Sequence, residues 1–492
     1  MKLESRILSL FFIIIFSFIN LSQASEIVEV CPNPYGSDGV EYVKLKVDKP
    51  CILSDEEGEI KINKTGLIVI AKNSTEFYNT FSYLPNYEFS KRFALSNSGE
   101  SIFLIENGKV VDEFTYGKNG LNYLDDGVIY FKKDGVWDFR YQDWSDFDVV
   151  KDFVEGKIII TPYSYKFDCS ENEKVTIASY TFTNFEMLEN LRNIEIYVDA
   201  TPVGGIPVEE MEIAKNYDVY FLNSDSYKNF HYKFGLCKNK VVITTENWVW
   251  DNRGYIVEFE SEKVAKLLRE ILEYDKAYNA TPGKIGNIKG VKKFENGKEF
   301  NFEGHVEVFV IPDENPIFDI ISNAKSRLYI QAPYIDFKWY NGTPLLDSIK
   351  KAAKRAEVKI LLDSKYNKNR NLDTAEFLNR IAKIENLNIE VKLVELKGFN
   401  SLHGKLIIAD DEVVITSANF NMYGFKLNRE IGIIIYSKEV SDFLANQFLE
   451  DFGNNKEKSA LKPKLGYVEL IPSLILLLIA LFIVFKVLKE RF

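Results

Sequence analysis

A segment of this chain occurs twice, and a repeated segment predicts two copies of one structural unit. His231-Tyr-Lys233 matches His403-Gly-Lys405, and the tetrapeptide Val-Val-Ile-Thr follows each of them, at 241–244 and 413–416. Hydroxyl residues then occur thirteen and fourteen residues after each histidine, an asparagine sixteen after and a glutamate twenty-seven after. These residues are Thr244, Thr245, Asn247 and Glu258 in the first copy and Thr416, Ser417, Asn419 and Glu430 in the second.

Each copy predicts a strand, a tight turn and a second strand. The first strands are expected at Tyr232–Leu236 and Gly404–Ala409, and the turns at Lys238-Asn239 and Asp410-Asp411. Because alternate residues of a strand share a face, the histidine and lysine of each copy should point the same way. The hydroxyl and amide residues follow at the exit of the neighbouring strand. Two such sets facing each other would surround one pocket with near two-fold symmetry.

These residue types suit chemistry at a phosphorus atom. The two lysines and two asparagines can hold nonbridging oxygens, where negative charge builds up. One imidazole can attack the phosphorus, and the other can protonate the leaving oxygen. Glu258 and Glu430 are the candidates to fix the tautomer of each histidine. The chemistry needs no metal or other cofactor, and a chain with three histidines has few residues for a metal cluster.

The pattern resembles that of the phospholipase D superfamily, in which His-x-Lys-x₄-Asp precedes a hydroxyl-rich turn, an asparagine and a later glutamate. The second copy matches in full, through His403, Lys405, Asp410, Ser417, Asn419 and Glu430. The first copy has Lys238 where the family has aspartate, in a turn away from the predicted pocket. The resemblance covers about 150–452. It implies metal-independent cleavage of phosphodiester bonds through a phosphohistidine, with His231 as nucleophile and His403 as acid, although the spacing itself leaves the two roles open.

The region around the motifs predicts an α/β double domain. From about residue 165, apolar strand patterns alternate with helical ones, which favours strands buried between helices. Half 1 is expected at 151–300 and half 2 at 301–455. Half 1 looks trimmed, because no helical pattern fits between Ile158–Thr161 and Val175–Tyr180.

Residues 26–150 predict a separate β-sandwich, because short alternating runs are separated by glycine, asparagine, aspartate and proline. Glu41–Val47 and Ser101–Ile105 are examples of these runs. The stretches Ile27–Pro34 and Ala94–Gly99 resemble the lamin-tail domain, an immunoglobulin-like sandwich. That resemblance implies a non-catalytic module that binds a surface partner, and a spacer that only adds stability fits the fold equally well.

The two ends predict export and a membrane anchor. A basic start, an apolar run and the small residues Ser22 and Ala24 predict a signal peptide over 1–24, with an uncleaved anchor as the alternative. Residues 467–488 predict a single transmembrane helix, and the basic tail at 489–492 places its end in the cytoplasm. The bulk of the chain would then be extracellular.

Export permits disulfide bonds. The four cysteines pair within domains as Cys31–Cys51 and Cys169–Cys237, with free buried thiols as the alternative.

Together these features predict a membrane-anchored, extracytoplasmic phosphodiesterase. Phospholipid is the favoured substrate, because a short tether at 453–470 would keep the site near the lipid surface. The net charge of −11 argues against a general coating of nucleic acid but not against a local basic groove. A metal-independent nuclease is therefore the first alternative, and a non-catalytic surface adhesin is the second.

Overall fold

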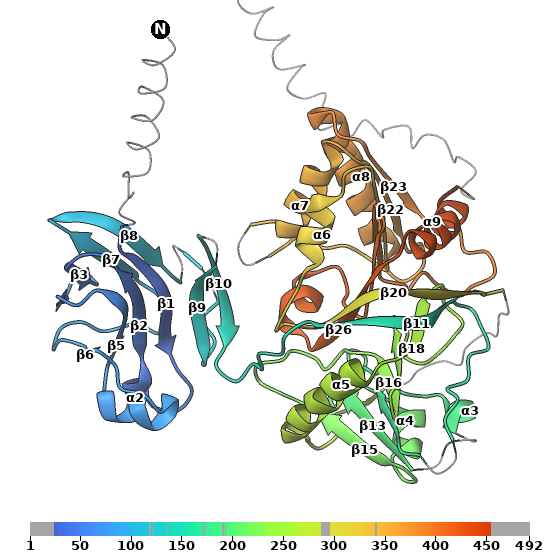
Figure 1. Ribbon diagram of the computed structural model, residues 1–492, viewed down its shortest axis with the longest axis horizontal. Helices are drawn as coiled ribbons and strands as arrows, with labels where there is room; N and C mark the ends of the chain where they lie inside the picture. The colour runs from blue at the N-terminus through green and yellow to red at the C-terminus, as the bar shows by residue number, and fades with distance from the viewer. Residues whose placement is uncertain are drawn as a thin grey trace, which may run out of the picture.

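The computed structural model describes residues 24–453, except 118–119, 122, 134, 171–172, 189–190, 192, 287–295 and 340–341. The chain forms a β-sandwich and a larger α/β body, drawn in blue on the left and in green to red on the right of Figure 1. The predicted transmembrane helix and tail, and the predicted signal peptide up to its last residue, lie outside the described residues. Among the helices of the described part, none is long and apolar enough to cross a membrane.

Two sheets make the sandwich that the alternating runs predicted. One has the strand order β10-β9-β1-β2-β5-β6, and the other has the order β4-β3-β7-β8. Inward-facing side chains such as Val43, Leu45 and Leu104 form a shared core. The relation to the lamin-tail family stays a prediction. The bounds are β1 Glu26–Asn33, β2 Tyr42–Val47, β3 Cys51–Ser54, β4 Glu59–Ile62, β5 Gly66–Ala71, β6 Tyr87–Glu88, β7 Ser101–Glu106, β8 Lys109–Thr115, β9 Val128–Lys133 and β10 Val136–Tyr141.

A short helix, α2 (Ser74–Phe81), covers the outer face of the six-stranded sheet, where the sequence indicated no helix. The Asn73 side chain caps it by accepting from two backbone N–H groups of the first turn. The helix buries Phe77 in a cluster with Cys31, whereas Cys51 points into the core between the sheets. The predicted Cys31–Cys51 bond is therefore wrong, because the two thiols lie on opposite sides of this sheet and both are free.

One sheet of fourteen strands runs through the body and joins its two halves. The order is β15-β13-β12-β16-β17-β18-β11 and then β20-β26-β25-β24-β21-β22-β23, so the second seven strands mirror the first seven. The long strands β11 and β20 pair at the centre, between the green and the orange parts of Figure 1. This order confirms the predicted pseudo-symmetric α/β unit. The bounds are β11 Val150–Ile160, β12 Val175–Ala178, β13 Ile194–Asp199, β15 Asp218–Leu222, β16 Phe234–Cys237, β17 Lys240–Thr244, β18 Tyr255–Glu260, β20 Lys298–Ile311, β21 Arg327–Ala332, β22 Glu357–Leu362, β23 Ile389–Leu393, β24 Leu406–Ala409, β25 Glu412–Thr416 and β26 Glu430–Tyr436.

The helices show how half 1 is trimmed. The described part of half 1 has α3 (Phe185–Leu188), α4 (Val208–Ile213) and α5 (Glu262–Asp275), and half 2 has α6 (Ile317–Asn323), α7 (Pro344–Ala353), α8 (Lys368–Glu385) and α9 (Lys438–Gly453). Between β11 and β12 the described residues contain no helix, as predicted. Instead, a Cys169–Cys237 disulfide with Cα atoms 6.1 Å apart ties that segment to the end of β16, which confirms this pairing.

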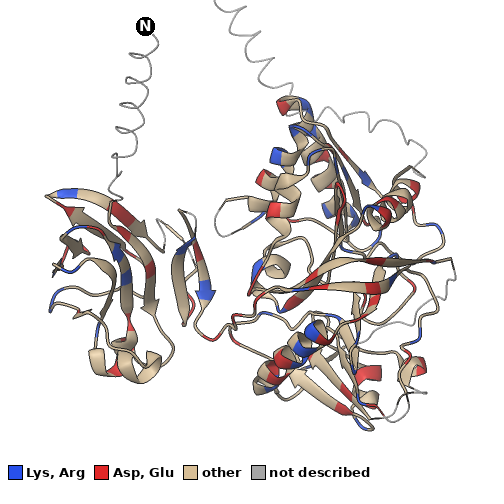
Figure 2. Cartoon of the chain, in the orientation of Figure 1, with Lys and Arg blue, Asp and Glu red and all other residues tan. Residues whose placement is uncertain are grey.

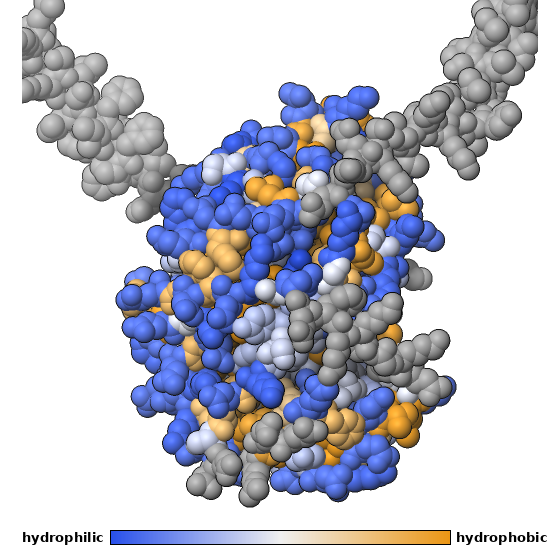
Figure 3. Space-filling view, turned by 90° about the vertical axis from the view of Figure 1, so that its right-hand side faces the viewer, coloured by the Kyte–Doolittle hydropathy of each residue, from blue (hydrophilic) through white to orange (hydrophobic). Residues whose placement is uncertain are grey.

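The surface is mixed in charge. Acidic and basic residues are interspersed over both units (Figure 2). On the face in Figure 3, hydrophilic residues predominate and apolar residues form separate patches. This distribution agrees with the modest net negative charge of the chain.

The sandwich packs on the body around Lys426. This lysine lies in a short π-helical turn, Tyr423–Leu427, that leads into β26. Its Nζ is 2.7 Å from the Asp138 carboxylate of β10 and lies over three aromatic rings. The rings are those of Phe131, Phe139 and Trp144, with centroids 5.7, 5.2 and 5.6 Å from Nζ. The sandwich is thus held against the turn that lies between Asn419 and Glu430 of the second motif copy.

Candidate active site

The two motif histidines lie where the halves meet, because the segment before each histidine pairs with the opposite half through the bridges Phe230–Arg429 and Leu402–Arg253. His231 and His403, each with its lysine two residues on, come just before β16 and β24, because these strands begin two residues later than predicted. The N–H of His231 donates to the carbonyl of Arg429 at 2.8 Å, and the N–H of His403 donates to that of Arg253 at 3.0 Å. Each histidine is therefore anchored to the backbone of the opposite half.

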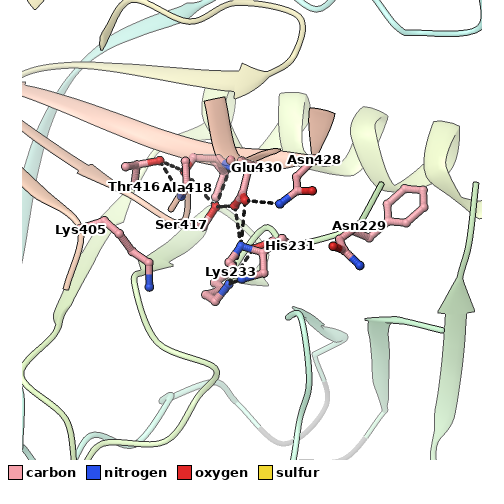
Figure 4. A network of polar contacts seen from close by, with 12 residues as sticks. Asn229, His231, Lys233, Lys405, Thr416, Ser417, Ala418, Asn428 and Glu430 are labelled. Carbon is pink, nitrogen blue, oxygen red and sulfur yellow. Dashed lines mark hydrogen bonds and ion pairs between the residues drawn. The ribbon is translucent and has the colours of Figure 1, made fainter. Parts of the chain in front are cut away.

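A carboxylate from the opposite half also holds each imidazole. The Nδ1 of His231 is 2.8 and 2.9 Å from the two oxygens of Glu430, as Figure 4 shows. The Nδ1 of His403 is 3.1 Å from Glu246. An ionised carboxylate only accepts hydrogen bonds, so Nδ1 carries the proton in both rings and Nε2 is left to react.

Each carboxylate is held in turn by a hydroxyl and an amide. Ser417 donates to Glu430 at 2.5 Å, and Asn428 donates to it at 3.0 Å. The corresponding donors to Glu246 are Thr245 and Asn252, both at 3.0 Å. The hydroxyls at the other repeated position, Thr416 and Thr244, instead donate to backbone carbonyls of the adjacent strand. These contacts orient the glutamates before any substrate binds.

The two lysines lie against the imidazoles. The Nζ of Lys233 is 3.2 Å from both ring nitrogens of His231 and donates to its carbonyl at 2.7 Å. The Nζ of Lys405 is 3.3 and 3.1 Å from the ring nitrogens of His403 and donates to its carbonyl at 2.8 Å. Both lysines are buried. They concentrate positive charge where an anionic phosphodiester would bind.

Burial sets the protonation of the site. It lowers the pKa of His231 to about 4, although Glu430 opposes this, so the free imidazole is neutral at pH 7. Burial and Lys405 also lower the pKa of His403, against the opposing effect of Glu246. Burial lowers the pKa of Lys233 to about 7 and that of Lys405 to about 8.

The structure corrects the predicted role of Glu258. This residue lies within β18, opposite Val242, and its carboxylate accepts a hydrogen bond from Tyr165 at 2.5 Å. Glu246, which the sequence prediction did not include, holds His403 instead.

The structure also places Asp410 outside the site. Its carboxylate accepts hydrogen bonds from the backbone of Lys325, Ser326 and Arg327, which fixes the start of β21. Lys238 occupies the corresponding turn of half 1 and pairs with Glu173 at 2.7 Å. The difference between the motif copies at this position therefore falls in a structural turn.

The two motif asparagines follow β17 and β25 at the same end of the sheet. The Oδ1 of Asn247 is buried and has no hydrogen-bond partner among the described residues. Asn419 is half-buried at the corresponding position. Both are available for the role in substrate binding that the sequence predicted.

Buried arginines that the sequence prediction missed join the two halves. Arg429 of half 2 pairs with Asp275 at the end of α5 at 3.3 Å, and also with Asp313 at 3.1 Å. Arg253 of half 1 pairs with Asp451 near the end of α9 at 2.8 Å. An Asn-Arg dipeptide occurs at both places, at 252–253 and 428–429, and this was the sequence signal that could have identified them.

Comparisons with known proteins agree with this site. Residues 317–452 match the family model described as "Cardiolipin synthase, PLD-like domain". A cardiolipin synthase of Clostridium perfringens is 34% identical over 145 residues, which are 28% of this chain and 28% of that protein. One from Geobacillus thermodenitrificans is 32% identical over 138 residues, 27% of this chain and 26% of that protein. The match thus spans less than a third of the length of these relatives.

Solved structures give matches at low similarity. The phosphatidylserine synthase of Haemophilus influenzae has a TM-score of 0.44 and 14% identity, over 64% of this chain and 89% of that chain. The phospholipase D family member Nuc of Salmonella typhimurium has a TM-score of 0.26 and 20% identity, over 32% of this chain and 98% of that chain.

The second half of the chain therefore contains a phospholipase D-like domain. The match to the family model begins at Ile317, so it includes His403 and Glu430 but not the first motif. Half 1 has the same arrangement, because its strand order mirrors that of half 2 and each half supplies the glutamate that contacts the histidine of the other.

Proposed function

We propose that the body cleaves phosphodiester bonds through a covalent phosphohistidine, with His231 as nucleophile and His403 as general acid and base. The carrying observation is that each imidazole is held by a buried carboxylate of the opposite half, so the two motifs form one reciprocal site. Exposure supports these roles, because the side chain of His231 is 8% exposed and that of His403 is 29% exposed. A buried neutral imidazole keeps its lone pair for attack, and the more exposed one meets the leaving group and then water.

The reaction has two steps. First, Nε2 of His231 bonds to phosphorus, the bond to the leaving oxygen breaks, and that oxygen takes the Nε2 proton of His403. Second, His403 takes a proton from water, the hydroxide oxygen bonds to phosphorus, and the phosphorus–nitrogen bond breaks to restore His231. An alcohol in place of water would give transfer instead of hydrolysis. Lys233 and Lys405 offset the charge of the nonbridging oxygens in both steps.

Substrate binding prepares His403 for the first step. Burial and the nearby lysine keep its pKa low in the free protein. An anionic phosphodiester between the rings favours the protonated imidazole and so raises this pKa.

Replacement of either histidine tests the mechanism. His231→Ala and His403→Ala should each lower kcat/KM by roughly 10³-fold or more, and the double variant should lose little more, because the two rings act as a unit. His305→Ala is the matched control, since this exposed histidine lies on β20 against Phe153, away from the site. Activity should survive an excess of chelator. Full activity of His403→Ala, or loss with chelator alone, would overturn the mechanism.

Phospholipid is the proposed substrate class. An apolar loop supports this proposal: Val203 is 88% exposed, and its N–H donates at 2.6 Å to the hydroxyl of Tyr180, whose ring centroid is 4.6 Å from that of His231. Such a side chain beside the site suits contact with acyl chains.

Single-stranded nucleic acid is the second candidate. Tyr366 is 67% exposed, and the Nζ of Lys365 lies 4.8 Å from its ring centroid, an arrangement that can stack a base beside a phosphate. Incubation with phospholipid vesicles and with single-stranded DNA separates the two candidates. Hydrolysis of neither would favour the adhesin.

We also propose that the chain is exported and anchored, with the body outside the cell. The predicted signal peptide and apolar C-terminal run support this placement, as does the Cys169–Cys237 disulfide, because disulfides persist in oxidising compartments. Protease added to intact cells tests it.

A further inference from the structure

The strand pairing shows which residues of the two motifs correspond. Thr244 lies opposite Ile256 in half 1, and Thr416 lies opposite Gly432 in half 2. The connection between the paired strands is four residues shorter in half 1. Gly254 lies two residues before Ile256, and Glu430 lies two residues before Gly432. Gly254 therefore occupies the place in half 1 that Glu430 has in half 2.

The residues that precede these positions confirm the correspondence. Gly254 and Glu430 each follow an Asn-Arg dipeptide. Arg253 and Arg429 each pair with an aspartate near the end of the helix of the opposite half. The two places are therefore equivalent in three dimensions, although Gly254 follows His231 by 23 positions in the sequence and Glu430 follows His403 by 27.

The carboxylate of half 1 comes from a different strand. Glu246 follows β17, two residues after Thr244, and the equivalent residue after β25 is Ala418. Each half thus has one glutamate and one small residue, in exchanged positions. The small residue makes room, because a Cβ on Gly254 would lie 2.1 Å from the Glu246 carboxylate.

We infer that Glu246 is the positioning residue for His403, in a site where the carboxylate has moved from the start of one strand to the end of its neighbour. This inference rests on the proposed function. Glu246 is fully buried and has the same three kinds of partner as Glu430: an imidazole, a hydroxyl and an asparagine amide. It fixes the Nδ1–H tautomer of His403 and favours its protonated form, which the leaving oxygen requires.

The first test replaces the carboxylate without changing its size. Glu246→Gln should lower kcat by about 10–100-fold, the range for loss of a partner that orients a reacting group. It should also shift the alkaline limb of the kcat/KM profile to lower pH, because Glu246 raises the pKa of His403 and of Lys405. Glu258→Gln is the matched control, since Glu258 has the spacing of Glu430 but contacts Tyr165. An active Glu246→Gln with an unshifted profile, or an inactive Glu258→Gln, would overturn the inference.

The second test moves the carboxylate to the place it has in half 2. Glu246→Ala should be nearly inactive, and Glu246→Ala with Gly254→Glu rebuilds the alanine–glutamate arrangement of Ala418 and Glu430. The double variant should recover at least tenfold of the lost activity. Thermal unfolding of both variants shows whether they fold. Native-like unfolding of the double variant without recovery would overturn the positional equivalence.

The histidine variants separate this inference from the proposed function. If His231→Ala and His403→Ala are both active, the phosphohistidine mechanism is wrong. If both are inactive while Glu246→Gln is fully active, the mechanism holds and the role of Glu246 is wrong.

Discussion

At the scale of single residues, the site brings together ionisable groups whose charged forms are disfavoured by burial. His231, both lysines and both orienting glutamates are buried, and His403 is partly buried. The lysines carry a large part of this cost, because burial lowers the pKa of Lys233 to about 7 and that of Lys405 to about 8. An unfolded chain would protonate both near the ordinary lysine value of about 10.5. The charge that binds a phosphodiester is thus held at the expense of folding stability.

Replacement of both lysines by methionine should therefore stabilise the protein and abolish activity. The wild-type folded state binds fewer lysine protons than the unfolded state from about pH 7 to above pH 10, so wild-type stability gains from these groups as pH rises through this range. The stability advantage of Lys233→Met with Lys405→Met should then shrink by about 1–2.5 kcal/mol per pH unit between about pH 8 and 10. Urea unfolding of both proteins across this range measures the difference. If the difference in free energy of unfolding between the variant and the wild type does not change with pH, burial does not lower the pKa values of the two lysines.

At the scale of elements, the sequence predicted much of the body because its patterns are local. The predicted first strands end within one residue of β16 and β24, and the predicted turns at Lys238-Asn239 and Asp410-Asp411 join these strands to β17 and β25. The role predicted for Glu258 was wrong because equal separation from the histidine along the chain does not ensure an equivalent position in three dimensions. A connection four residues shorter moves Gly254 into the place of Glu430, so the match at Glu258 was a coincidence of counting.

The π-helical turn at Tyr423–Leu427 is the element that connects the sandwich to the site. Asn428, which holds Glu430, follows it directly. Lys426→Ala should remove the ion pair with Asp138 and the packing against three rings, lowering the free energy of unfolding by about 2–4 kcal/mol. It should also lower kcat about 3–10-fold through Glu430.

Two variants isolate the cause of this effect. Lys426→Met retains the apolar stem and should keep more of the stability. Lys228→Ala removes an exposed ion pair with Asp125, 3.5 Å apart, between the same two units and should cost no more than about 0.5 kcal/mol. Denaturant unfolding and steady-state kinetics give both readouts. Equal effects of Lys426→Ala and Lys228→Ala would mean that the sandwich does not support the turn.

At the scale of the whole molecule, one continuous sheet carries both halves, and crossed arginine–aspartate pairs lock them across the pseudo-two-fold. The local patterns that predicted the strands did not predict these pairs, because each joins residues more than 150 positions apart. The sandwich packs against half 2 at Lys426 and against half 1 through the stacked rings of Trp144 and Tyr227. The body is thus symmetric in its site and asymmetric in what surrounds it.

The placement of this molecule relative to a membrane can be tested on intact cells. The predicted signal peptide and basic tail place 26–465 outside, so added protease should remove the body and leave a small C-terminal fragment. Thiol labelling in denaturant gives an independent readout from the same cells. Cys31 and Cys51 are free and buried, so they should label on unfolding alone, whereas Cys169 and Cys237 should label only after reduction. A body protected from protease, with all four cysteines reactive in denaturant without reductant, would show that the chain stays in a reducing compartment and that the export proposal is wrong.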